Sequence, residues 1–376
     1  MYALGVGPKE EPHPRTRCGY LPSECIRSFE RALNQGGPVA TGRALHFAAD
    51  IVCSGGIDAL LRSLWEYSVC HVGIGSPRVF VYLKKRSGEL LDMLRRLPDE
   101  QAYKAEEFQI RVGELVLVLR DAPIRTTVPW PKVGAETHTA AWIRGVAGGA
   151  ADTAAVRKVW RPEGDEPILR TVGAELCKAI TEGATERALF WIKWLFEEEA
   201  RIKKEVKGAV LTTIDRGSGF GGSTKAKSGA GHFVLALYAE IYKELAGKQA
   251  IRMTEEFQVL LDLWRGGDKK VQGAAKKGVL ALLTQILCEV PRWKVPAAPP
   301  LIRDPVVTTQ AIRQVPKFFA EVLAFDPPGA GAAVVKAFRT RGKVDAKAVA
   351  AAKKGEAHED QMSAFDKALE AYFAKM

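Results

Sequence analysis

The stretch "GRALHFAADIVCSGGIDALLRSLWEYS", residues 42–68, repeats one helical pattern on both sides of a glycine pair. Apolar residues recur there at intervals of three and four, which places them on one face of a helix that turns once every 3.6 residues. Before Gly55-Gly56 these residues are Leu45, Ala48, Ala49 and Val52, and after it they are Ile57, Leu60, Leu61, Leu64 and Trp65. The stretch therefore predicts two helices joined by a short glycine turn.

The same periodicity extends over most of the chain. Pro22 opens a helical segment that Gly36-Gly37 closes, because proline suits the first helical turn and glycine interrupts a helix. "ELVLVLR", residues 114–120, is by itself equally compatible with a short strand. We predict an all-α fold, with further helices over about 79–94, 104–120, 168–182, 186–206, 231–246, 254–265, 269–290 and 306–324.

Residues 121–167 interrupt this periodicity with many prolines and glycines and include three tryptophans, Trp130, Trp142 and Trp160. We expect them to form a long irregular connection, with one or two short helices, that packs onto the rest of the chain. A weak repeat of "RAL" after a glycine turn, at residues 43–45 and 187–189, supports two halves of similar build. The predicted two-domain helical array has an extended arm (1–20), an N-terminal helical domain (21–121), the irregular connection (122–167), a C-terminal helical domain (168–326) and an Ala/Lys-rich helical tail (327–376).

The bulk composition indicates an anionic partner. The 376 residues carry a net charge of +11, which favours nucleic acid or a membrane face. No apolar run has the length needed to cross a bilayer, so we expect no membrane partner. The N-terminus lacks the pattern of a signal peptide, and six cysteines scattered in apolar contexts are typical of buried thiols. We expect an intracellular, reducing compartment (cytoplasm or nucleus) and no secretion.

A glycine-rich stretch, "TIDRGSGFGGSTKAKSGAGH" (residues 213–232), is the most conspicuous candidate site. It lacks the G-K-[ST] end of a P-loop, whose lysine must reach the nucleotide phosphates. Gly217, Gly219 and Gly222 match dinucleotide-binding spacing, but no helix opens directly after them. We therefore predict no cofactor and no ATP binding. The stretch is either a flexible linker or a basic loop that binds phosphate through Arg216, Lys225 and Lys227.

Basic residues cluster in three stretches. From Arg201 to Gly231, seven lysines and arginines face two acidic residues. Each contact that neutralises a nucleic-acid phosphate releases counterions, so such clusters favour binding, although many charge runs are only solvated helix faces. The candidate phosphate-binding residues outside the glycine-rich stretch are Arg78, Lys84, Lys85 and Arg86 in "SPRVFVYLKKR", and Arg265, Lys269, Lys270, Lys276 and Lys277 in "RGGDKKVQGAAKKG".

Catalytic and metal motifs are not found in the sequence. Cys70 and His71 are neighbours on a predicted helix, where consecutive side chains do not face each other. Cys18, Cys25, Cys53, Cys70 and His71 contain no C-x₂-C pair, which structural zinc sites usually show. The aromatic run "ALFWIKWLF" (188–196) matches a core or subunit contact better than a base-stacking platform. We predict no catalytic and no metal-binding residues.

Residues 24 to about 83 resemble the helical, clamp-loader-like segment that follows the ATPase module in replication-associated AAA+ proteins of the Werner helicase-interacting type. The features that match are Gly36-Gly37, the alanine-rich residues 44–49, Ser54-Gly55, and Gly73-Ile74 with Pro77. The chain departs from that family at Cys70-His71, where relatives carry an acidic pair, and it lacks the ATPase module. The resemblance implies a helical oligomerisation or docking element with a link to DNA replication, and no activity.

Together these patterns predict a non-catalytic helical scaffold or adaptor, possessing basic faces that bind nucleic acid or a nucleoprotein complex without base readout. Homo- or hetero-oligomers are compatible with this prediction. Two alternatives stay open: a structural or assembly subunit of a large intracellular particle, such as a virion or ribonucleoprotein, and an enzyme with an unrecognised helical active site.

Overall fold

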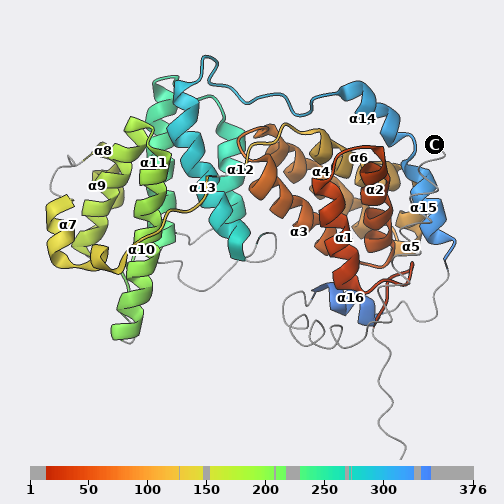
Figure 1. Cartoon of the computed structure of the whole chain (residues 1–376), viewed down its shortest axis with the longest axis horizontal. Coiled ribbons are helices and arrows are strands. Elements are labelled where there is room, and N and C mark those ends of the chain that lie inside the picture. Colours follow the sequence, from red (N-terminus) through yellow and green to blue (C-terminus); the bar gives the residue numbers. More distant parts are fainter. Residues whose placement is uncertain are drawn as a thin grey trace, which may run out of the picture. The chain divides into compact units, whose positions relative to one another are not determined.

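The computed structural model describes residues 14–126, 128–146, 153–206, 209–216, 229–266, 271, 273–325 and 332–339. These residues form helices joined by loops, and within them only isolated bridges, such as Gly73 with Arg125, pair extended backbone (Figure 1). The predicted all-α fold is confirmed. The "ELVLVLR" stretch, left open above, is part of helix α6 (Glu106–Asp121).

The chain divides into two compact units. Unit 1 comprises residues 1–64, 85–121 and 302–376, and unit 2 comprises residues 65–84 and 122–301. Two of the four divisions fall inside helices α3 (Ile57–Tyr67) and α4 (Arg78–Arg96), and each unit is assembled from segments that are far apart in sequence.

Unit 1 is built around helix α2 (Pro38–Cys53), which contacts four other helices of the unit (Figure 1). Its residues Ala44, Ala48, Ala49, Ile51 and Val52 are fully or almost fully buried. Every residue from Ala44 to Cys53 is buried, which suits a central place, because neighbouring helices pack on all sides of the helix. Its neighbours are α1 (Pro22–Asn34), α5 (Asp99–Lys104), α6 and α15 (Val315–Leu323).

Unit 2 has helix α13 (Gly273–Glu289) at its centre, where Val279 to Leu283 and Ile286 to Cys288 are buried. Helices α9 (Pro167–Glu182) and α10 (Thr185–Glu205) meet through Gly183, whose left-handed backbone (φ 71°) is the usual end of a helix before a tight turn. α13 contacts the π-helical turn η1 (Ser68–Val72), α9 (Pro167–Glu182), α10 (Thr185–Glu205), α11 (Ala230–Gly247), α12 (Thr254–Arg265) and the 3₁₀ turn η4 (Val290–Arg292).

Three helices near the C-terminus belong to unit 1, although the sequence placed residues up to 326 in the C-terminal domain. The single helix expected over 306–324 is two, α14 (Pro305–Ile312) and α15, because Pro316 starts a new helix and cannot continue an old one. α14 packs on α6, α15 on α2 and α6, and α16 (Ala332–Arg339) on α1. Of the predicted tail (327–376), only α16 lies within the described residues.

The irregular connection is an integral part of unit 2 rather than a spacer between domains. It forms the 3₁₀ turn η2 (Ala135–His138) and the short helices α7 (Ala140–Val146) and α8 (Ala154–Val159). α8 packs on α9 and α11, and the ring of Trp142 lies 5.8 Å from that of Trp191 on α10. At the N-terminus, the described part of the predicted arm packs on unit 1, where the Arg17 amide donates to the Ser54 hydroxyl at 2.9 Å.

The packing of α15 on α6 gives a test of the revised boundary. A Cβ atom added at Gly113 on α6 would lie 2.2 Å from Val315 Cγ2, so Gly113→Ala must push the two helices apart. We expect a loss of about 1–3 kcal/mol in the free energy of unfolding, measured with urea. Gly88→Ala on α4 is the control, because a Cβ atom there meets nothing within 4 Å, and it should stabilise by about 0.5–1 kcal/mol. Equal effects of the two substitutions would contradict this packing.

Candidate nucleic-acid interface

Trp264, near the end of α12, brings together residues from three helices of unit 2. The ammonium of Lys276 on α13 lies 4.7 Å from the centroid of the Trp264 ring, within the range of a cation–π interaction. The ring of His232, at the start of α11, meets the same indole edge-on at 4.9 Å. The starts of α11 and α13 therefore meet at the end of α12.

The start of α4 lies beside α12 in the same unit. Lys84 Nζ is 3.3 Å from Asp262 Oδ2, an exposed ion pair that Gln258 shares through a 2.7 Å hydrogen bond. α13 also approaches η1, just before α4, because a Cβ atom at Gly278 would lie 2.9 Å from Val69 Cγ1. Two basic stretches almost 200 residues apart in sequence are thus neighbours in unit 2.

The predicted basic residues of these stretches differ in how much of them reaches solvent. Arg78, Lys84 and Lys277 are exposed, and Lys276 is half-buried against Trp264. Arg265 is also half-buried, and burial lowers its pKa. Lys85 is exposed and belongs to unit 1. We call Lys84, Arg265, Lys276 and Lys277, together with Trp264, the Trp264 cluster.

Arg86, another predicted phosphate-binding residue, forms ion pairs inside unit 1, and its role in phosphate binding stays a prediction. Its guanidinium donates to Glu89 at 2.8 Å and to Glu114 at 3.2 Å. Glu89 also pairs with Arg111, so two arginines and two glutamates join α4 to α6 inside unit 1. The bonds from Arg86 lower the pKa of Glu89. Arg86 is therefore a structural residue of unit 1.

Arg216, also predicted to bind phosphate, lies inside unit 2. Its side chain is 7% exposed and forms an ion pair with Asp165, whose side chain is fully buried. The guanidinium also donates to the Thr212 hydroxyl at 2.8 Å and the Val159 carbonyl at 3.1 Å, and it lies over the Phe233 ring. A phosphate has no access to a guanidinium enclosed in this way. Arg216 ties the connection to the start of the glycine-rich stretch.

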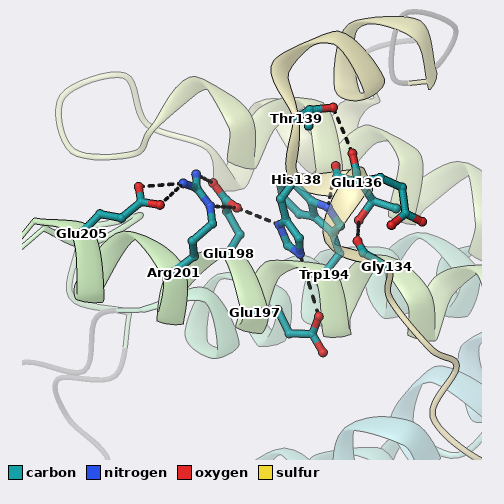
Figure 2. A network of polar contacts seen from close by, with 10 residues as sticks. Gly134, Glu136, His138, Thr139, Trp194, Glu197, Glu198, Arg201 and Glu205 are labelled. Atoms are coloured by element: carbon teal, nitrogen blue, oxygen red, sulfur yellow. Dashed lines mark hydrogen bonds and ion pairs between the residues drawn. The ribbon is translucent and has the colours of Figure 1, made fainter.

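Arg201, which contributed to the basic surplus of residues 201–231, is neutralised by two glutamates (Figure 2). Its guanidinium pairs with Glu198 at 2.5 Å and with Glu205 at 2.6 Å. Lys225, Lys227, Lys269 and Lys270, the remaining predicted residues, lie outside the described part of the chain. The choice between linker and phosphate loop for the glycine-rich stretch therefore stays open.

Sequence reasoning missed a histidine–carboxylate pair in the same network. His138 Nδ1 lies 2.8 Å from Glu198 Oε2, and its ring stacks on Trp194 at 4.9 Å (Figure 2). The Trp194 indole N–H in turn donates to the Thr137 carbonyl at 3.2 Å. No local pattern signals this pair, because 60 residues separate its members. The contacts anchor η2 to α10, and the aromatic run of α10 is packed inside unit 2, as expected.

Three of the six cysteines, Cys18, Cys25 and Cys53, lie together around Asp50, which their spacing did not show. Asp50, which is fully buried, accepts a hydrogen bond from the Cys18 amide at 3.1 Å and one from the Cys25 thiol at 3.5 Å. Burial raises the pKa of the Cys18 and Cys25 thiols, as does the neighbouring Asp50 charge, and burial raises that of Cys53 to about 12. Protonated thiols are poor metal ligands and nucleophiles. Within the described residues no group of three or more histidines, cysteines and acids is placed to hold a metal ion.

No family model, curated protein or solved structure matches the chain. Among the described residues, no helix has the length and apolar character needed to span a membrane. The functional interpretation therefore depends on the geometry of the chain's own residues.

The buried pair predicts how Arg216 responds to substitution. Arg216→Gln leaves the Asp165 carboxylate buried without its counter-charge, so we expect a loss of about 3 kcal/mol or more in the free energy of unfolding. Lys204→Gln, on the exposed end of α10, should change it by no more than about 0.5 kcal/mol. Urea denaturation of both variants measures the difference. A stable Arg216→Gln variant with weakened nucleic-acid binding would restore Arg216 as a phosphate ligand.

The network of Figure 2 predicts a pH-dependent contribution to stability. Burial of Glu198 opposes its ionisation, but hydrogen bonds from Arg201 and His138 outweigh burial, so its pKa is lowered. A carboxyl with a lowered pKa stabilises the fold above its unfolded pKa of about 4.3, and the contribution is lost as the pH falls below that value. Glu198→Gln should therefore lower the melting temperature of the protein at pH 7, and the difference from the parent should be smaller at pH 3.

Thermal unfolding at both pH values measures this effect. Glu163→Gln removes an exposed carboxylate of unit 2 and is the control, for which we expect the same melting temperature as the parent at pH 7. A difference for Glu198→Gln that is as large at pH 3 as at pH 7 would contradict the ion-pair interpretation.

Proposed function

We propose that this protein is a non-catalytic helical scaffold or adaptor that binds nucleic acid, or a nucleoprotein complex, without reading base sequence. The single observation that carries the proposal is the Trp264 cluster, in which basic residues of separate stretches come together in one unit. Lysines bind phosphates as point charges and carry no sequence information, so such a cluster suits backbone contact.

The distribution of charge supports the same interpretation. Over its sequence, unit 2 contains 29 lysines and arginines against 21 aspartates and glutamates, and therefore carries eight of the eleven surplus positive charges. Arg216 and Arg201 form ion pairs inside unit 2, so the positive charge that a partner can reach must belong to other residues of the unit. The exposed lysines of the Trp264 cluster are part of it.

The proposed role does not depend on the replication resemblance. Residues 24–64 of the resembling segment belong to unit 1 and residues 65–83 to unit 2, so the segment is not one compact element. A role in replication is one setting for the proposed binding. An assembly subunit of a nucleoprotein particle is the alternative if the cluster meets a protein instead.

The triple variant Lys84→Gln, Lys276→Gln and Lys277→Gln tests the proposal. Each lost phosphate contact should reduce the slope of log affinity against log salt by about 0.9 on duplex DNA, independently of its sequence. Helix content should not change, because glutamine forms helices about as well as lysine. Fluorescence anisotropy with random-sequence duplexes at several salt concentrations measures the slope.

A second triple variant, Lys132→Gln, Lys178→Gln and Lys294→Gln, is the matched control. It removes the same charge from exposed positions of unit 2 outside the cluster. We expect it to keep the slope of the parent. Equal slopes for the parent and both variants would favour a protein neighbour, and the assembly-subunit role would replace nucleic-acid binding.

A further inference from the structure

Unit 2 contains a cavity that the proposed nucleic-acid binding does not use. Its volume is about 340 Å³, within the range of small-molecule sites. Residues of α8, α9, α11, α13 and η4 line it, all within unit 2. Its apolar wall is formed by Ile180, Ile241, Leu245 and Leu287.

One carboxylate in this cavity lacks a counterpart. Glu244 Oε1 is buried and has no hydrogen-bond partner, and no ion pair joins Glu244 to any described residue. By contrast, Glu240, one turn earlier on α11, pairs with Lys243 at 2.6 Å and with Lys158 at 3.6 Å. A buried carboxylate oxygen without a donor costs free energy, which a ligand carrying an N–H group would recover.

Two cations also line the cavity. Lys248 follows Glu244 by one turn, is exposed, and makes no ion pair with it. Arg292 donates to the Thr181 carbonyl at 2.6 Å, so part of its guanidinium is already engaged. Lys248 is therefore the side chain most available to an anionic group of a ligand.

We propose that this cavity binds a small zwitterion with an apolar body, of the type of an apolar α-amino acid. Its ammonium group donates to Glu244, its carboxylate faces Lys248, and its side chain fills the space between Ile180, Ile241, Leu245 and Leu287. This ligand satisfies the three chemical features of the cavity at once. A simple amine leaves Lys248 without a partner, and a simple carboxylate leaves Glu244 without one.

Three matched probes test the proposal by isothermal titration calorimetry. L-Phenylalanine carries both charges, 2-phenylethylamine lacks the carboxylate, and 3-phenylpropionate lacks the ammonium. We expect L-phenylalanine to bind the full chain with a Kd of about 1 mM or lower, and each analogue to bind at least about tenfold more weakly. Equal binding of the three probes, or no binding of L-phenylalanine, would overturn the assignment.

Three variants locate the site. Glu244→Gln should weaken the binding of L-phenylalanine about tenfold and leave the binding of 3-phenylpropionate unchanged. Lys248→Gln should weaken the binding of L-phenylalanine about tenfold and leave the binding of 2-phenylethylamine unchanged. Glu240→Gln, on the same helix and with the same change in charge, should bind all three probes like the parent. Lys248 is exposed, so its variant keeps the test valid if Glu244→Gln perturbs folding, which circular dichroism reports. If Lys248→Gln binds L-phenylalanine like the parent, or Glu240→Gln weakens it as much as Glu244→Gln, the site is wrong.

Discussion

The charged side chains Asp165 and Glu198 are buried where an oppositely charged side chain and hydrogen bonds compensate them, because desolvation of a lone ion costs several kcal/mol. Asp165 and Arg216 meet this requirement with each other and with Thr212, and Glu198 meets it with Arg201 and His138. Asp50 meets it with an amide and a thiol of nearby residues. These interactions hold the connection and the N-terminal segment to the helices, so internal pairing decides which basic residues stay available to a partner.

This pairing also explains why some basic residues form internal ion pairs and others are exposed. Three of the four arginines in residues 78–86 and 201–231, namely Arg86, Arg201 and Arg216, form ion pairs inside a unit. A guanidinium suits a carboxylate, because it forms several hydrogen bonds in a fixed geometry. Lys84 and Lys277 are exposed, and Lys84 pairs with Asp262 at the surface. The Trp264 cluster combines such lysines with an indole that fixes the position of one of them. Glu244 differs, because its buried Oε1 has no hydrogen-bond partner, and the proposed ligand site rests on that difference.

Much of the fold follows from local periodicity, and the tertiary arrangement does not. α1, α2, α3, α6, α9, α10, α11 and α12 occupy nearly the residues that spacing predicts, since each has an apolar face and a glycine or proline at an end. The packing of α15 on α6 in unit 1 brings Val315 against Gly113, two residues about 200 positions apart. The ion pairs of Arg86 and Arg216 depend on Glu114 and Asp165, which lie 28 and 51 positions away in the sequence. A charge count along the sequence identifies a basic residue but cannot show its partner.

The accessibility of individual lysines tests the nucleic-acid proposal most directly. Acetylation of the protein with and without a random-sequence duplex, read by mass spectrometry, compares the rate at each lysine. The account predicts that the duplex slows the modification of Lys84, Lys276 and Lys277 and leaves Lys132, Lys178 and Lys294 unchanged. Equal rates with and without duplex at all six positions, or protection of the second set alone, would contradict it.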